Sequence, residues 1–415
     1  MLNQSRPESP AVVPRTSRWQ FAVLYFSEGA PIGFLWWAMP TLLRTEGVAL
    51  ERITGLTAAL VLPWTLKFLW APLVDAVRGP RWGFRHWAGA AQLGMGLALL
   101  PLLFVDPASS FGWWVALLLI HAVCAATQDV AIDALAVSAV DERERGRLTA
   151  AMQIGMLAGR SLFGGGAIVL AGYLGWSGVF GALVVAVWIS LAVLWRMNEP
   201  TMIRIDSKNT WVIFGATLRA GFTRQTTWWG LGFALIAGAG FEAGGALAGP
   251  LLVDAGVPTS STGWFFAGPV VVAMALGGWW GGRWVDRGPR VVRVKIALGG
   301  VSLMVMGAGL AATIGASGMV MMGCLAGLYL GIGCFTAASY ALFMDLTDPK
   351  LGATQFSTFM AATNGCEAWA VWVAGRLATG MEYGPTFMVM AGIGLIGLLF
   401  LGPLQRFREV SDGKS

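Results

Sequence analysis

Charged residues are scarce in this sequence. Asp, Glu, Lys and Arg together make up 12% of the 415 residues, while hydrophobic residues make up 56%. A soluble protein carries about a quarter charged residues, because charged side chains keep its surface in water. The shortage excludes an ordinary soluble protein and predicts a chain whose surface is largely covered by lipid.

Side chains that perform chemistry or bind metals are also few. There are two histidines, His86 and His121, and no His/Glu pair with the spacing of a helical metal site. The sequence has no Cys-x-x-Cys pair and no phosphate-binding Walker loop. We therefore expect no metal, no cofactor, no ATPase activity and no enzymatic reaction. The cysteines all lie in apolar stretches and are interpreted as packing residues: Cys124, Cys324, Cys334 and Cys366.

Apolar stretches of about twenty residues recur along nearly the whole chain. Each is long enough to cross a hydrocarbon layer of about 30 Å as a helix. The 57 glycines fit this interpretation, because small residues let membrane helices pack closely. We predict an all-α integral membrane protein with twelve transmembrane helices, over residues 19–43, 53–77, 87–105, 113–138, 148–172, 177–195, 228–250, 260–282, 296–315, 319–344, 356–378 and 385–404.

The basic residues are unevenly distributed between the loops. If both termini are cytoplasmic, 23 of the 28 Lys and Arg residues fall in cytoplasmic segments, against Arg44 and Arg52 outside and three within helices. Because cytoplasmic loops collect Lys and Arg, the pattern predicts that both termini are cytoplasmic. Topology and membrane lipid then account for the net charge of +6, and we expect no nucleic-acid partner. The first apolar run is long enough to span, so no cleavable signal peptide is expected.

A weak internal repeat divides the chain into two halves. Leu42-Leu43 and Gly47-Val48 recur as Leu251-Leu252 and Gly256-Val257, an offset of 209 positions. Asp75 recurs as Asp286 at nearly the same offset. Two repeated six-helix units are typical of secondary transporters, which bind their solute between the units. We predict a cytoplasmic tail (1–18), a first bundle (19–195), a linker (196–227), a second bundle (228–404) and a cytoplasmic tail (405–415).

Several short motifs resemble those of a known family. GGRWVDRGPR at 281–290 is similar to the Asp-Arg loop that major facilitator proteins carry between helices 8 and 9. LPWTLKFLWAPLVD at 62–75, ATQDVAIDALAV at 126–137 and ERERG at 142–146 resemble the muropeptide permease (AmpG) and acetyl-CoA transporter group. Within that group, the segment 24–48 looks closer to the RhtX/FptX siderophore permeases. The resemblance implies the major facilitator fold, with two pseudo-symmetric six-helix bundles, in a bacterial inner membrane.

Ionisable side chains inside the predicted spans are costly, at about 3 kcal/mol each on insertion scales, so they should face protein or water. None lies in the third, sixth, ninth or twelfth span, which the resemblance implies are the outer helices. We predict that seven ionisable residues of the remaining spans, together with Gln128, form a pathway for substrate and protons. The seven are Glu28, Lys67, Asp129, Asp133, Arg160, Glu242 and Glu367.

Asp129 and Asp133 stand four residues apart, so both carboxylates lie on one face of the predicted helix 113–138. Lys67 lies at a similar depth in the membrane and is a plausible partner for Asp129. An ion pair that forms and breaks during transport changes proton affinity, which is the physical basis of proton coupling. A purely structural ion pair is the alternative interpretation.

Glu28 and Glu242 occupy corresponding helices of the two halves, and glycines flank both. They are interpreted either as proton or substrate sites in a loosened stretch of helix or as hydrogen bonds between helices. Arg160 either binds an anionic group of the solute or neutralises Asp129 or Glu28. Trp36 is interpreted as part of an interfacial belt at the span end or as lining the periplasmic entry, where it would stack on an aromatic ligand.

Charged residues at the cytoplasmic helix ends form a second predicted group. We expect a gate that closes the cytoplasmic side in the outward-facing state, and the alternative is helix capping and topology. The predicted cytoplasmic gate consists of Asp75, Glu142, Arg145, Asp286 and Arg287.

These features together predict a secondary active transporter. The leading hypothesis is proton-coupled import of a siderophore-like or other bulky organic solute by a monomer. A muropeptide or acyl-CoA-type permease is the alternative, and an integral-membrane enzyme or a scaffold is a hypothesis of another class. Buried carboxylates argue against a scaffold, and the missing nucleophile or metal pattern argues against an enzyme.

Overall fold

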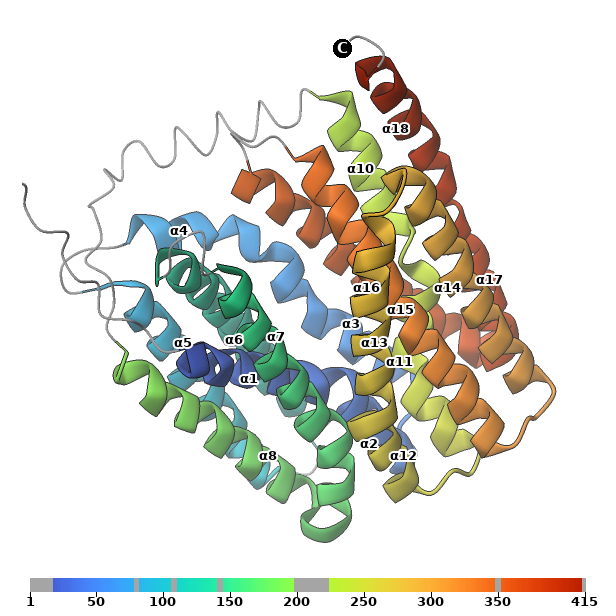
Figure 1. Ribbon diagram of the computed structural model, residues 1–415. Helices are drawn as coiled ribbons and strands as arrows, with labels where there is room; N and C mark the ends of the chain where they lie inside the picture. Colours follow the sequence, from blue (N-terminus) through green and yellow to red (C-terminus); the bar gives the residue numbers. More distant parts are fainter. Residues whose placement is uncertain are drawn as a thin grey trace, which may run out of the picture.

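The structure is a computed structural model that describes residues 18–77, 82–105, 110–139, 145–197, 224–347 and 352–412. Its long elements are all helices, and each of the twelve predicted spans coincides with helical structure. Figure 1 shows the blue-to-green helices of the first half gathered beside the yellow-to-red helices of the second half. The predicted fold class is therefore confirmed.

The first half contains six spans, four of which include a π-helical segment or a 3₁₀ turn. The helices and their interruptions are α1 (Arg18–Gly33), a π-helical segment (Phe34–Ala38), α2 (Met39–Thr45), α3 (Leu50–Leu66), a 3₁₀ turn (Lys67–Leu69), α4 (Ala71–Ala76), α5 (Phe84–Leu99), a 3₁₀ turn (Leu100–Leu103), α6 (Phe111–Ala139), α7 (Arg145–Arg160), a second π-helical segment (Ser161–Gly165) and α8 (Gly166–Trp195). Helix α8 turns sharply at Gly175, whose φ is +63°, a conformation that glycine adopts without strain. Helix α8 therefore includes the end of the fifth span and all of the sixth span.

The second half also contains six spans. Its helices are α10 (Gln225–Ile236), α11 (Ala239–Asp254), α12 (Thr259–Phe265), a third π-helical segment (Phe266–Val270), α13 (Val271–Val285), α14 (Arg290–Thr313), α15 (Gly318–Leu346), α16 (Gly352–Met381), α17 (Tyr383–Leu395) and α18 (Gly397–Asp412). Helix α18 continues eight residues past the predicted span end at 404, because helix formation does not depend on the membrane boundary. Seven of the described helical segments are long and apolar enough to cross a membrane.

The sequence repeat corresponds to a repeated helix ending. Gly47 after α2 and Gly256 after α11 have φ of +78° and +73°. The amide of Val48 donates to the carbonyl of Leu43 at 3.0 Å, and Val257 donates to Leu252 at 2.9 Å. Glycine in this left-handed position ends a helix while satisfying its last carbonyls. The first and seventh spans therefore end in the same way.

Glycines let the first and fifth spans pack closely. A Cβ at Gly29 would lie 2.1 Å from the carbonyl oxygen of Met156, and one at Gly155 would lie 2.0 Å from that of Ala22. No side chain fits at these positions, so the backbones of α1 and α7 are in direct contact, as small residues allow in membranes. Glu28 lies in α1 and Arg160 lies in α7, so this close contact fixes the position of one relative to the other.

Because the spans alternate in direction, the molecule has two ends. We call the end that carries Arg44, Asp254 and Glu382 the Arg44 side, and the end that carries Arg18, Arg196 and Arg224 the terminal side. The two halves meet closely toward the Arg44 side. A Cβ at Gly165 would lie 2.0 Å from the amide nitrogen of Ala267 in the other half.

Candidate transport site

A cavity of about 850 Å³ lies between the two halves. Its walls come from the first, second, fourth and fifth spans and from the eighth, tenth and eleventh, as shown by Glu28, Lys67, Asp129, Arg160, Trp279, Tyr340 and Glu367. No lining residue among those described belongs to α5, α14, α17 or the part of α8 after Gly175. The third, sixth, ninth and twelfth spans, which contain no ionisable residue, are therefore outer helices, as the family resemblance implied.

The cavity extends toward the terminal side. Asp133, Gln153 and Trp279 line it and are exposed to solvent. All three lie in the terminal-side part of their helices. Water and solute can therefore reach the cavity from this side.

The Arg44 side is closed by aromatic side chains from both halves. Trp37 of the first half stacks on Phe266 of the second, with ring centroids 5.6 Å apart. Tyr329 meets the edge of Trp37 at 5.9 Å, and all three rings are buried. These rings form a layer beyond which the described cavity does not extend.

The three π-helical segments meet at this closed region. The segment after α1 contacts the one after α7, which in turn contacts the one between α12 and α13. The hydroxyl of Ser161 also donates to the backbone carbonyl of Ala267 across the boundary. A π-helical turn inserts an extra residue into a helix and is frequent at functional sites. Here the three insertions coincide with the contact between the halves.

Acidic and basic groups of the first half form one cluster in the cavity. The ammonium group of Lys67 contacts the carboxylate of Asp129, whose side chain is 8% exposed. One turn further along the helix, Asp133 accepts a hydrogen bond from the hydroxyl of Tyr25. Glu28 is buried within electrostatic reach of both aspartates, and its Oε2 has no hydrogen-bond partner among the described residues. The structure thus brings together these four predicted residues.

Arg160 lies between this cluster and the second half. Its guanidinium group covers the ring of Trp36 at 4.7 Å from the centroid, which is cation–π geometry. Its Nε is buried without a hydrogen-bond partner among the described residues. Glu28, Glu242 and Glu367 all lie within its electrostatic reach, and none of them is within ion-pair distance. The charge of Arg160 therefore acts on carboxyl groups of both halves.

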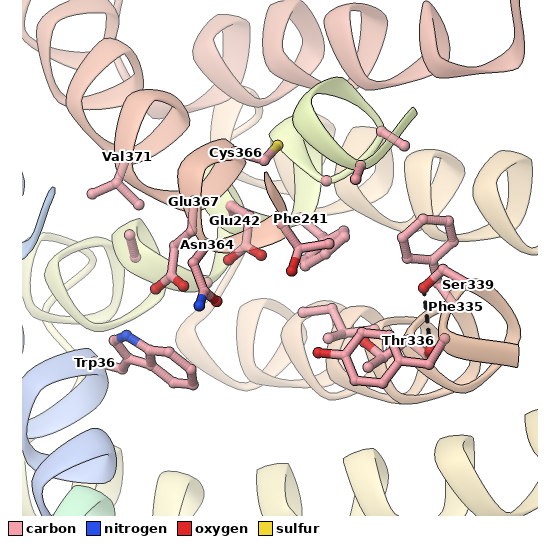
Figure 2. A pocket seen from close by; sticks show the side chains of 18 of the residues that line it. Trp36, Phe241, Glu242, Phe335, Thr336, Ser339, Asn364, Cys366, Glu367 and Val371 are labelled. Carbon is pink, nitrogen blue, oxygen red and sulfur yellow. Dashed lines mark hydrogen bonds between the residues drawn. The ribbon is translucent and has the colours of Figure 1, made fainter. Parts of the chain in front are cut away.

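A smaller pocket of about 190 Å³ adjoins the cavity and is lined mostly by residues of the second half. Glu242 of α11 and Glu367 of α16 line it, together with Asn364 and Tyr340. Figure 2 shows the polar ends of Glu242, Glu367 and Asn364 turned toward one space, with Trp36 opposite them. Arg160 and Trp36 line both this pocket and the larger cavity, so the two are continuous.

Five carboxyl groups and two cations thus surround one water-accessible space, with Glu28, Asp129 and Asp133 from the first half and Glu242 and Glu367 from the second. Burying several like charges is costly, so such a set favours bound protons or a cationic solute group. The arrangement offers exchange of protons and recognition of a charged solute.

The family follows from a comparison with known proteins. Residues 21–366 match the family model described as Major Facilitator Superfamily. The chain belongs to the major facilitator superfamily. Among curated relatives, it is 27% identical to the anhydromuropeptide permease of Escherichia coli (strain K12), over 94% of this chain and 80% of that permease.

Solved major facilitator structures share the fold. The D-xylose-proton symporter superposes with a TM-score of 0.73 at 13% identity, over 93% of this chain and 95% of its own. The nucleoside transporter NupG gives a TM-score of 0.72 at 13% identity, over 92% and 98%. The predicted resemblance to the muropeptide permease group is supported by these findings, and the resemblance to siderophore permeases remains a prediction.

One residue of the predicted substrate and proton pathway, Gln128, does not line the cavity. Gln128 is fully buried inside the first half, where its amide faces the hydroxyl of Ser27 at 3.4 Å. It lies on the opposite side of α6 from the solvent-exposed Asp133, because the two are five residues apart.

For the predicted cytoplasmic gate, Glu142 and the side chains of Asp75 and Arg145 lie outside the described residues. Asp286 pairs with Arg290 at 2.8 Å, and Arg290 also pairs with Asp345 at 2.8 Å. Arg287 is exposed, without an ion-pair partner in the described part of the chain. The gate remains a prediction, because the structure is open on the terminal side.

Sequence reasoning missed Tyr25 and Tyr340, which carry no charge at neutral pH. A signal for Tyr25 was present, since it stands three residues before Glu28 and so shares its helix face. Tyr340 lies in α15, and it lines both spaces. Trp36, which was predicted to lie at the membrane interface or at the periplasmic entry, lines both spaces.

Proposed function

We propose that this major facilitator protein is a secondary active transporter that imports an organic solute across the bacterial inner membrane by alternating access, coupled to protons. The observation that carries the proposal is the cavity between the halves, to which both halves contribute carboxyl groups. A transporter of this kind alternately opens the central site to each side by moving one bundle against the other.

Proton coupling is supported by the Lys67–Asp129 ion pair. A carboxylate next to an ammonium group holds its charge, and the same carboxylate without that partner in a buried site takes up a proton. Movement of α3 relative to α6 would separate the pair and bind a proton at Asp129. Glu28, which lies beside Asp129, is the next acceptor along the cavity.

The solute proposed first is a muropeptide. The similarity to an anhydromuropeptide permease extends over 94% of this chain, so it includes both halves and the cavity between them. A volume of about 850 Å³ suits a solute larger than a single sugar. Trp36, Trp64 and Trp279 offer apolar ring faces along its walls, and Arg160 offers a cation for a carboxylate.

A siderophore-like solute is the second candidate. It is favoured by the segment 24–48, which carries Glu28, Trp36 and Trp37 and resembles the first helix of siderophore permeases. The same cavity size suits it. The two solutes differ in whether they carry a sugar ring or a chelated metal, so transport assays separate them.

We propose that the terminal side faces the cytoplasm, as the distribution of Lys and Arg predicts. The structure then represents the inward-open state, in which solute leaves toward the cytoplasm. The proposed cycle begins with the opposite state, in which the Arg44 side opens to the periplasm.

Transport into proteoliposomes tests the proposal. Purified protein is reconstituted, a pH gradient is imposed, and uptake of a radiolabelled anhydromuropeptide is compared with uptake of a ferric siderophore. We expect the muropeptide to accumulate above its external concentration and a protonophore to abolish the accumulation. Failure of both solutes to accumulate with correctly folded protein would refute transport of these classes. Accumulation that persists with the protonophore would refute proton coupling.

A further inference from the structure

The pocket of about 190 Å³ between α11, α15 and α16 has features that the general transport cycle does not require. Glu367 is 7% exposed and still lines the pocket. Neither the carboxyl group of Glu367 nor that of Glu242 has a hydrogen bond or ion pair among the residues that the structure describes. Figure 2 shows both carboxyl groups turned into the same space. A buried carboxyl group without a partner is costly unless a ligand supplies one.

Aromatic side chains surround these two carboxyl groups. Trp36, Phe241, Phe335 and Tyr340 line the pocket. Aromatic faces attract ammonium groups through the ring quadrupole, and carboxylates attract them by charge. Two carboxyl groups inside an aromatic wall are therefore a binding environment for an organic ammonium group.

The mouth of the pocket carries the opposite charge. Arg160 lies over the ring of Trp36 there, and its Nε has no hydrogen-bond partner among the described residues. The N–H groups of a guanidinium group match the two oxygens of a carboxylate. A ligand in this pocket thus meets acceptors at the inner end and donors at the mouth.

We propose that this pocket binds a zwitterionic end of the transported solute, with its ammonium group between Glu242 and Glu367 and its carboxylate on Arg160. Asn364 can accept from the ammonium group or donate to the carboxylate, because a side-chain amide does both. The inference rests on the proposed function and adds the chemical class of the solute group, an amino-acid or peptide end. The sugar or other bulky part would occupy the larger cavity, with which the pocket is continuous.

Binding of small probes to purified protein in nanodiscs tests this assignment without a membrane gradient. The probes are dialanine, its N-acetylated form, which lacks the ammonium group, and its C-terminal amide, which lacks the carboxylate. Tryptophan fluorescence and thermal stabilisation report binding. We expect dialanine to bind, and each blocked form to bind at least about tenfold more weakly.

Two variants separate the ends of the ligand. Glu367→Gln should lose the preference for dialanine over the N-acetylated form and keep the preference over the amide. Arg160→Gln should show the reverse, and Arg160→Lys should retain part of the preference. Glu382→Gln, an exposed glutamate outside both spaces, is the matched control and should bind like the unaltered protein.

The outcomes distinguish this inference from the proposed function. Absence of dialanine binding, or variants that weaken all three probes equally, would overturn the zwitterion site, whatever the proteoliposome uptake shows. Selective loss in the two variants would support the site even if no solute accumulated under a pH gradient, in which case only the proposed function would fail.

Discussion

The guanidinium group of Arg44 donates to both carboxylate oxygens of Asp254, at 2.8 Å to Oδ1 and 2.8 Å to Oδ2. The two residues are 210 positions apart and stand at the ends of corresponding helices of the two halves. Tyr383 also donates to Asp254 at 2.6 Å. A second pair, Glu51 with Arg376 at 3.3 Å, joins the halves nearby. These contacts join the two halves at the Arg44 side, which is closed in the state observed.

Removing the Arg44–Asp254 pair should favour opening of that side. Partly exposed ion pairs contribute about 1 kcal/mol or less, so Arg44→Ala should increase the open population by about fivefold or less. Opening is measured by labelling a cysteine introduced at Thr336, in the cavity, with a membrane-impermeant maleimide added on the Arg44 side. The exchanged pair Arg44→Asp with Asp254→Arg should restore slow labelling. If the single and exchanged variants label alike, the pair does not hold this side closed.

The helices and their order were predictable because they depend on local properties. Apolar length sets the spans, and Gly47 and Gly256 end corresponding helices in the same conformation. Lys67 and Asp129 were placed together because they share a depth. The Arg44–Asp254 pair was not predicted, because it depends on how one half is rotated against the other. That rotation changes during transport, so helix periodicity does not encode it.

The position of individual polar residues was less predictable for a related reason. Gln128 and Asp129 are neighbours in sequence, yet only Asp129 lines the cavity. Deciding between them requires the rotation of α6 about its axis, and this helix is apolar on nearly every face. The π-helical segments were also missed, since their extra residue depends on contacts between helices rather than on local sequence.

Neutralising Asp129 should uncouple transport from protons. In Asp129→Asn, the ammonium group of Lys67 loses its partner and no protonatable group remains at this position. We expect gradient-driven accumulation to fall to the level of empty vesicles, while exchange of labelled for unlabelled solute continues. Both are measured in proteoliposomes, with Glu382→Gln as the control. Accumulation at the unaltered rate in Asp129→Asn would show that this carboxyl group does not carry the coupling proton.

Gly165 should be required for closure of the Arg44 side. A Cβ at this position would meet the backbone amide of Ala267 at 2.0 Å, and a backbone atom cannot move aside as a side chain does. Overpacking of this kind costs about 1–3 kcal/mol, so Gly165→Ala should lower the population of the closed state by about tenfold. Neighbouring Gly166→Ala is the control, since its nearest contact would be an ordinary 3.4 Å. Maleimide labelling at Thr336→Cys from the Arg44 side should rise in the first variant only, and equal labelling in both would contradict the role of this contact.

Arg287 and Arg290 should form ion pairs in different states of the transport cycle. Arg290 already pairs with Asp286 and Asp345 in the observed state, whereas Arg287 has no ion-pair partner in the described part of the chain. If the predicted gate closes the terminal side, Arg287 gains its partner only in the other state. Arg287→Gln should therefore slow uptake without changing the melting temperature of the purified protein, while Arg290→Gln should lower both. Uptake rates in proteoliposomes and thermal unfolding in nanodiscs provide the two measurements. A normal uptake rate in Arg287→Gln would remove this residue from the gate, because its only expected contact is made when the terminal side closes.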